Sequence, residues 1–268
     1  MKKFISVLLI VVLMCTMLIG CSEKSNEAQP TNEEQPNNEQ PANEPTDEEN
    51  KYGGTLVSAL PGDLLTFNPA TALDDMMLTV AKNIFNKLVQ VDYNNNVIPD
   101  LAHDWKISED GLEYVFYLTE GIKFHDGEEL TSEDVKWTYD QVIENKSPMV
   151  ASFTGLKEII AEDKYTVKFV FNEVNASFLS ELTRFGNYVL PKHYYEQFAW
   201  EASTQNLPVG TGPFKLVEYK KGVGVTLEAN EDYFKGRPYL DRIVYQIIAD
   251  PNTMLQAFLN GEIDVIDT

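Results

Sequence analysis

The chain has 268 residues, of which 42 are acidic and 21 are basic, and its formal net charge is −21. Nine of the acids and three of the bases precede Lys51, so the remainder still holds 33 acids against 18 bases. This balance argues against nucleic acid as a partner, because phosphate recognition requires a basic patch. Both cysteines, Cys15 and Cys21, lie near the N-terminus, which excludes disulfides, thiolate catalysis and cysteine-based zinc sites from the rest of the chain.

The first 21 residues have the pattern of an export signal. Met1-Lys2-Lys3 is basic, and an uncharged apolar run follows from Phe4 to Gly20. That run is close to the lower length limit for a membrane-spanning helix, so a permanent anchor is the alternative. The residues Leu18-Ile19-Gly20-Cys21 resemble a bacterial lipobox, in which the cysteine is acylated and becomes the mature N-terminus. We therefore expect residues 1–20 to be a lipoprotein signal peptide and Cys21 to be the lipid attachment site.

A polar segment follows this signal. Between Ser22 and Asn50 the apolar residues are Ala28 and Ala42, and four prolines interrupt a run of Asn, Glu, Gln, Ser and Thr. Nothing in this segment offsets the entropy lost when a chain is ordered. We therefore expect residues 21–50 to be a disordered acidic tether between a lipid and a folded body.

The first half of the folded region mixes helices and strands. Apolar residues at helical spacing predict a helix over Met76–Leu88 and a short amphipathic helix over Ser177–Phe185. β-branched and aromatic residues predict strands over Gly53–Leu60, Glu113–Thr119 and Tyr165–Phe171.

The stretch from Gly121 to Val135 places His125 beside several acids, as a metal or acid–base site does. A metal site needs further ligands at fixed spacing, and the three histidines of the chain form no HExxH or HxH pair. Turn and helix-cap preferences explain these residue types better than a metal site does. Asp126-Gly127 is a turn dipeptide, and Thr131 with Asp134 resembles a capping box. We interpret the stretch as a strand, a turn and a capped helix without a catalytic role.

The glycines of Pro208–Phe214 are typical of a phosphate-binding loop, which must open a helix. Here a strand pattern follows, so we reject a nucleotide site. The segments Phe214–Tyr219 and Val225–Asn230 predict a hairpin around Gly222 and Gly224.

The C-terminal part repeats the mixture of elements. Arg242–Ala249 predicts a buried strand, Asp250-Pro251 starts a helix that Gly261 ends, and Glu262–Asp267 predicts a last strand. Because the elements lack a strict βαβ rhythm, the fold class is α/β in the mixed α+β sense.

Three blocks of residues between Lys51 and Thr268 form a specific pattern. They are Ala102, Trp105, Ser108, Asp110-Gly111, Tyr114, Phe116, Leu118, Gly121, Lys123 to Gly127, Leu130-Thr131 and Asp134-Val135; then Gly210 to Phe214, Asn230, Asp232-Tyr233, Gly236, Pro238 and Leu240-Asp241; and finally Gly261 to Asp264. The pattern resembles the extracytoplasmic solute-binding proteins of peptide/nickel-type ABC importers. Phe234 departs from it, since tryptophan is usual there.

The resemblance implies a periplasmic-binding-protein-like clamp, in which two lobes close on a ligand. Residues 51–86 and 190–268 would form a discontinuous N-terminal lobe, and residues 87–189 would form an inserted subdomain. Members of the family are about twice as long, so we expect the second lobe to be absent, in a fragment or a truncated product. In many peptide binders that lobe carries an aspartate which pairs with the α-amine of the peptide.

The resemblance also implies ligand-binding candidates in two groups. The first is Thr71, Asp74, Asp75, Met76 and Met77, where the acids would meet an amine or cation and the methionines would pack against varied side chains. The second is Arg184, Phe185 and Asn187. For both groups the alternative is a structural role.

The implied function is solute capture without catalysis. The expected partners are an oligopeptide, dipeptide or similar solute, the ABC permease and ATPase subunits of an importer, and the membrane through the N-terminal lipid. No cofactor, metal or nucleic acid is expected. The expected location is the extracytoplasmic face of the cell membrane in a Gram-positive bacterium. A metal-chelate binder of the same family and a surface hydrolase that uses His125 are the alternatives.

Overall fold

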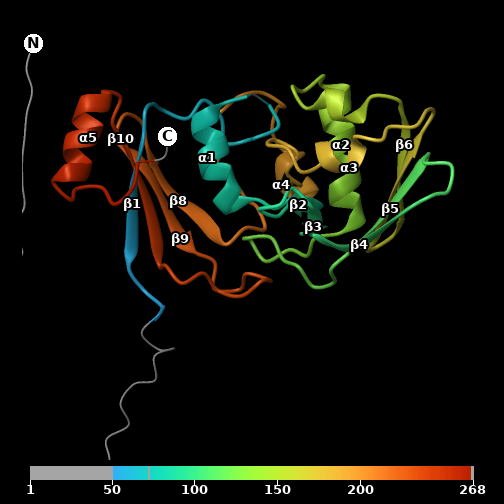
Figure 1. Ribbon diagram of the computed structural model, residues 1–268, viewed down its shortest axis with the longest axis horizontal. Coiled ribbons are helices and arrows are strands. Elements are labelled where there is room, and N and C mark those ends of the chain that lie inside the picture. Colours follow the sequence, from blue (N-terminus) through green and yellow to red (C-terminus); the bar gives the residue numbers. More distant parts are fainter. Residues whose placement is uncertain (1–50, 72, 267–268) are drawn as a thin grey trace, which may run out of the picture. The chain divides into compact units, whose positions relative to one another are not determined.

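The computed structural model describes residues 51–71 and 73–266, which belong to one compact unit (Figure 1). The expected signal peptide and tether lie outside the described residues. The first sheet has the strand order β1-β10-β9-β8, in which β1 and β10 are parallel and the other pairs are antiparallel. Its strands are β1 (Thr55–Leu60), β8 (Phe214–Lys220), β9 (Gly224–Ala229) and β10 (Arg242–Ile247).

The second four-stranded sheet is antiparallel throughout and has the order β4-β5-β7-β6. In its central strands buried and half-buried residues alternate, because successive side chains of a strand point to opposite faces. A separate hairpin precedes this sheet in the chain. The bounds are β2 (Val89–Val91), β3 (Val97–Pro99), β4 (Ala102–Ile107), β5 (Glu113–Leu118), β6 (Leu156–Asp163) and β7 (Thr166–Phe171).

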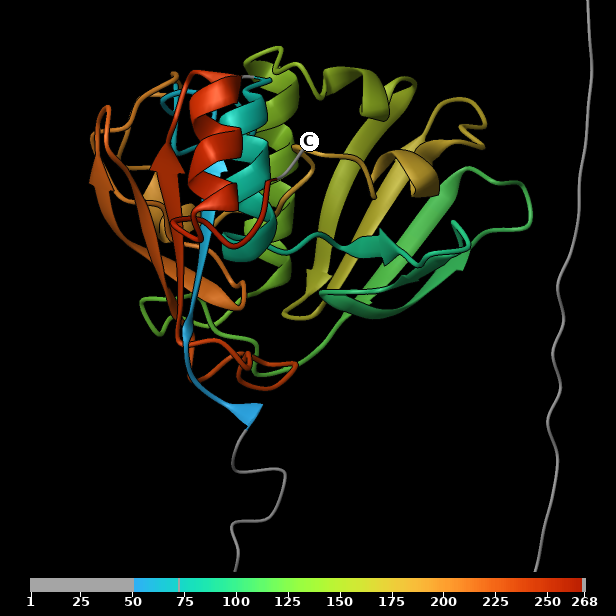
Figure 2. The same cartoon turned by 60° about the vertical axis from the view of Figure 1, so that its left-hand side comes forward.

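The helices pack against these sheets. Helix α1 contacts β8, and α2 contacts β6 and β7. Figure 2 shows α5 in front of the first sheet, where its Ala257 is buried with Ala59 of β1 and Ile263. None of the helices in the described part of the chain is long and apolar enough to cross a membrane. The helices are α1 (Asp75–Ile84), α2 (Ser132–Glu144), α3 (Phe178–Glu181), α4 (Lys192–Tyr195) and α5 (Pro251–Leu259), with a 3-10 turn at Val150–Phe153.

One buried apolar cluster joins the two sheets. It runs from Leu227 and Tyr245 in the first sheet through Ile84 of α1 to Phe116 and Phe169 in the second. The rings of Phe116 and Phe169 meet edge to face at 5.6 Å, a favourable aromatic geometry. The division into a lobe and an inserted subdomain at residues 87 and 189 remains a prediction.

Three outer strands share one irregularity. Each of β4, β6 and β8 lies at the edge of its sheet, and each shifts register against its neighbour. The shifts lie between Ala102 and Asp104, between Leu156 and Glu158, between Ala161 and Asp163, and between Leu216 and Glu218. Such bulges bend and twist a strand locally.

The mixed α/β class and the predicted strands over 53–60, 113–119, 165–171 and 242–249 are confirmed, and so is the hairpin of β8 and β9. The helix that starts at Asp250-Pro251 is confirmed as well, since Asp250 Oδ1 accepts a hydrogen bond from the Thr253 N–H at 2.8 Å. The helix predicted over Ser177–Phe185 is shorter and has its regular part at Phe178–Glu181.

Two other predicted elements are longer than the elements in the structure. The helix predicted to reach Leu88 ends at Ile84, whose carbonyl accepts a hydrogen bond from the Gly212 N–H at 2.7 Å. The predicted strand at Glu262–Asp267 is wrong for its described part, where a parallel bridge joins Val265 to Ser58. There the Asp264 N–H donates to the Val57 carbonyl at 2.8 Å, and the Asp264 side chain accepts from the Val57 N–H at 2.7 Å.

The stretch around His125 forms a turn followed by a capped helix. Gly127 has φ +96°, and its N–H donates to the Phe124 carbonyl. At the start of α2, one Asp134 oxygen accepts from the Thr131 N–H and from the Thr131 hydroxyl, both at 2.9 Å, and the other accepts from the Lys192 N–H at 2.9 Å. The predicted strand before the turn is an isolated bridge between Lys123 and Glu129.

We expect Thr131→Ala to lower the free energy of unfolding by about 1 kcal/mol, because it removes a helix cap. Thr131→Ser keeps the hydroxyl and serves as the control, with less than half of that loss. Urea denaturation followed by circular dichroism measures both. Equal stability of Thr131→Ala and the unmodified protein would contradict the capping role.

His125 forms hydrogen bonds that hold the loop of residues 208–214 against the turn before α2. Its Nδ1 accepts a hydrogen bond from the Gly210 N–H at 3.3 Å, and its Nε2 donates to the Gly212 carbonyl at 3.0 Å. A Cβ at Gly210 or Gly212 would come within 2.1 or 2.4 Å of the Ile84 backbone, so both positions require glycine. Burial lowers the pKa of His125 to about 4, and the ring is therefore neutral at pH 7.

This pKa predicts a loss of stability on mild acidification. Unfolded His125 takes up a proton near pH 6.5 and the folded ring does so near pH 4, so acid favours the unfolded chain in that window. Between pH 7 and pH 5 the expected loss is on the order of 2 kcal/mol. His125→Gln should flatten this dependence, and His103→Gln, on exposed β4, should leave it unchanged. Identical pH slopes of unfolding for His125→Gln and the unmodified protein would refute this assignment.

Candidate functional site

The parallel strands β1 and β10 end together at Leu60 and Ile247, and we call this end of the first sheet the carboxyl edge. The segments 61–71 and 73–74 follow β1 there and lead into α1. Asp74 ends the loop as the N-cap of α1, with its oxygens accepting from the Met76 N–H at 3.1 Å and the Leu65 N–H at 2.6 Å. In open α/β sheets ligands bind beside the carboxyl ends of the strands, so this edge is a candidate site.

The first group of candidate residues lies at the carboxyl edge. The Thr71 hydroxyl donates to the Asn68 carbonyl at 2.9 Å, and Met77 is fully buried in the core. Asp75 is exposed in the first turn of α1, and Met76 is half-buried. Of this group, Asp75 presents a charge to solvent, whereas the Asp74 carboxylate is buried as a cap.

The second group lies on the segment after α3. Arg184 pairs with Glu181 at 3.1 Å, and the Phe185 ring is 60% exposed. Asn187 is buried, where its Nδ2 donates to the Glu181 carbonyl at 2.7 Å and to Ser152 Oγ at 3.2 Å. Its Oδ1 has no hydrogen-bond partner among the described residues. The ligand-binding roles of both groups stay predictions.

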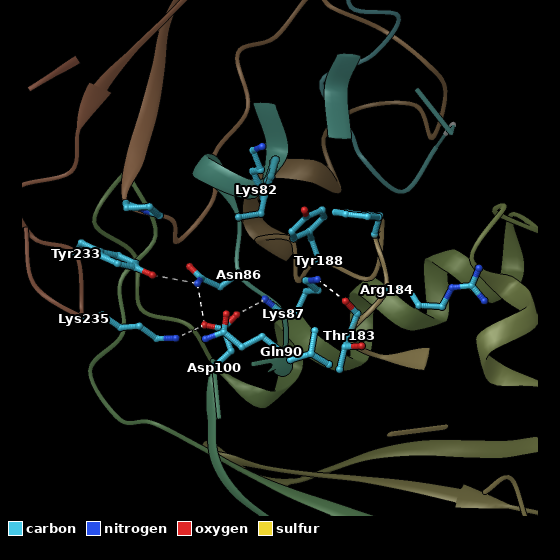
Figure 3. Close-up of a pocket in the computed structure, with 14 residues that line it drawn as sticks. Lys82, Asn86, Lys87, Gln90, Asp100, Thr183, Arg184, Tyr188, Tyr233 and Lys235 are labelled. Carbon is cyan, nitrogen blue, oxygen red and sulfur yellow. Dashed lines mark hydrogen bonds and ion pairs between the residues drawn. The ribbon is translucent and has the colours of Figure 1, made fainter. Parts of the chain in front are cut away.

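A cavity of about 600 Å³ opens at the other end of α1, and Figure 3 shows the side chains that line it. We call it the basic cavity. Its walls carry four aromatic rings and four cationic side chains against one carboxylate. These residues are Phe85, Phe185, Tyr188 and Tyr233; Lys82, Lys87, Arg184 and Lys235; and Asp100. In Figure 3 the Arg184 guanidinium points away from the others.

Asp100 organises one wall of the basic cavity. Its Oδ1 accepts from the Lys235 ammonium at 2.6 Å and from Asn86 Nδ2 at 2.9 Å, and its Oδ2 accepts from the Lys87 N–H at 2.9 Å. Asn86 Nδ2 also donates to the Tyr233 hydroxyl at 3.2 Å. The carboxylate is buried, and its charge is matched within this network.

Lys87 occupies the opposite wall. Its ammonium donates to the Thr183 carbonyl and stands 5.5 Å from the centre of the Tyr188 ring and 5.6 Å from that of Phe185 (Figure 3). Both rings offer their faces to the cation. Burial lowers the pKa of the Lys87 ammonium, and the charge of Asp100 opposes that shift.

Sequence reasoning found Arg184 and Phe185 but missed Lys87, Asp100 and Lys235. Lys87 was placed in the helix predicted over Met76–Leu88, whereas α1 ends at Ile84 in the structure. Asp100 and Lys235 are 135 residues apart, and no local pattern signals their contact.

Comparison with known proteins gives the family. Residues 96–268 match the sequence profile described as bacterial extracellular solute-binding proteins, family 5, middle part. The oligopeptide-binding protein AppA of Bacillus subtilis is 33% identical over 221 residues, which are 80% of this chain and 40% of the relative.

Two solved structures have the same fold. DppA of Helicobacter pylori, in complex with the peptide STSA, has a TM-score of 0.72 at 31% identity over 81% of this chain and 47% of that one. NikZ of Campylobacter jejuni, in complex with Ni(L-His), has a TM-score of 0.72 at 31% identity over 79% and 43%. The chain thus spans less than half the length of these relatives. The profile match covers most of the described residues, and the chain belongs to the bacterial extracellular solute-binding proteins of family 5.

Proposed function

We propose that this chain supplies the N-terminal lobe, with its inserted subdomain, of a lipid-anchored protein that captures peptides for an ABC importer. The family membership carries the proposal, and the names of relatives give the solute class: AppA is an oligopeptide-binding protein, and DppA was solved with a peptide. The permease and ATPase subunits of the importer and the cell membrane are the proposed partners. The lipobox at Leu18–Cys21 supports the lipid anchor.

The carboxyl edge has the chemistry to hold one end of a peptide. The exposed Asp75 carboxylate suits an α-amine or a basic side chain. Leu65 and Leu73 are 65% and 66% exposed beside it and offer apolar contacts to varied side chains. A clamp buries about 70–90% of its ligand between two walls, and we assign this edge to one of them.

A hydrolase that uses His125 is disfavoured. Both ring nitrogens of His125 are bonded to the 208–214 loop, at Gly210 and Gly212. A general base needs a free nitrogen within reach of the proton that it removes. His125 therefore serves the fold, and the proposed function includes no reaction.

Cys21→Ala should prevent acylation, because the cysteine sulfur carries the proposed lipid. The variant is expected to remain unprocessed or to leave the membrane fraction. Labelling with a fatty-acid analogue and fractionation of cells measure both effects, and Cys15→Ala is the control that should be processed normally. Unchanged processing and membrane retention of Cys21→Ala would exclude the lipid anchor.

One wall alone should bind peptide weakly. If a complete clamp binds near micromolar, about −8 kcal/mol, the loss of half of that leaves an affinity near millimolar. Residues 51–268 should therefore show millimolar affinity by calorimetry. A chimera that adds the matching remainder of AppA should restore micromolar affinity.

Asp75→Asn in this chimera should weaken binding about threefold, as expected for an exposed ion pair. Asp104→Asn, on exposed β4 of the other sheet, is the matched control. A micromolar affinity of residues 51–268 alone would contradict the two-wall proposal, and an unaffected Asp75→Asn chimera would remove the carboxyl edge from the site. Ni(L-His) belongs in the same titration, because NikZ binds it.

A further inference from the structure

We propose that the basic cavity is a second ligand site, for a small carboxylate that bears an aromatic ring. It lies beyond the peptide site proposed above and does not depend on it. Asp75 and Lys82 stand in the first and last turns of α1, and a ten-residue helix separates its ends by about 15 Å.

The charge of the cavity is the first reason. Residues from Lys51 onward hold 33 acids against 18 bases, yet Lys87 and Lys235 flank one carboxylate, Asp100, in the cavity. Lys235 and Asp100 pair at 2.6 Å and largely cancel each other. The positive charge of Lys87 then remains in the cavity, and a concave apolar wall concentrates the field of such a charge.

The surroundings of Lys87 are the second reason. No carboxylate of the described residues lies within ion-pair distance of its ammonium, although Thr183 and two ring faces contact it. Lys87 is half-buried, and the charge that offsets the desolvation of its ammonium, Asp100, is already paired with Lys235, so Lys87 has no counter-ion of its own. A ligand carboxylate at Lys87 Nζ would supply that counter-ion and would use donors that the Thr183 carbonyl leaves free.

The rings and the volume define the rest of the ligand. Phe185 is 60% exposed, and the rings of Tyr188 and Phe85, which line the same cavity, pack tilted at 5.8 Å. An aromatic ligand would stack on Phe185 and bury this face. About 600 Å³ is within the range of small-molecule sites and holds one ring with a short acid chain.

Calorimetric titration of the full chain with four probes tests the charge and ring requirements. 3-Phenylpropionate should bind at least tenfold more tightly than 3-phenylpropanamide, 3-phenylpropylamine or acetate. Titration with the dipeptide Ala-Phe then identifies the source of the carboxylate. Tighter binding of Ala-Phe than of 3-phenylpropionate indicates a peptide terminus, and the reverse order indicates a free acid. Equal or tighter binding of the amide or the amine would overturn the proposal.

Variants tie this binding to the cavity. Lys87→Met should reduce 3-phenylpropionate affinity at least tenfold, and Lys87→Arg should retain most of it. Lys106→Met is the matched control, because Lys106 also stands over a tyrosine ring, 5.3 Å from the centre of Tyr117, outside the cavity. Thermal unfolding of each variant checks that it is folded. Unchanged affinity in a folded Lys87→Met protein refutes the site, whereas Asp75→Asn tests the peptide site separately.

Discussion

The close approach of the 208–214 loop to the end of α1 is the contact on which the rest of the fold depends. The Gly212 N–H donates a hydrogen bond to the Ile84 carbonyl at the end of the helix, and the Gly212 carbonyl accepts one from His125. Thr211, between the two glycines, donates to Asn86 Oδ1 at 3.1 Å. Because Asn86 then orients Asp100, this single loop holds the end of α1, the turn at His125 and one wall of the basic cavity.

The sequence was sufficient where the signal is local. Alternating residues predicted β5 and β7, and the cap at Asp250 and the turn at Gly127 follow from the preferences of a few neighbouring residues. The end of α1 could not be predicted, because a glycine 128 positions further along terminates it. The segment after Gly261 forms a single bridge to β1 in place of the predicted strand, and its contact between Asp264 and Val57 spans 207 positions.

The two candidate sites were predicted in part. Asp75 at the carboxyl edge and Phe185 in the basic cavity were named from a family resemblance, and the structure shows their exposure. The cluster of Lys87, Asp100 and Lys235 depends on contacts across 13 and 135 positions, for which periodicity and motifs give no signal. A net acidic composition even points away from it, because total charge does not report how charges are distributed over a surface.

The register shifts of the outer strands have a consequence for how this protein meets other copies of itself. An open strand edge is a template for pairing with another chain, and a cysteine-free body has no disulfide to limit how far it opens. The shifts in β4, β6 and β8 break the regular row of donors and acceptors at three edges, and Ser58 of β1 is bridged to Val265 at the fourth. Charged residues such as Lys157, Glu158 and Glu218 stand at these irregular points and are costly to bury in a second sheet. The same edges that complete each sheet thus also discourage pairing between the sheets of two copies.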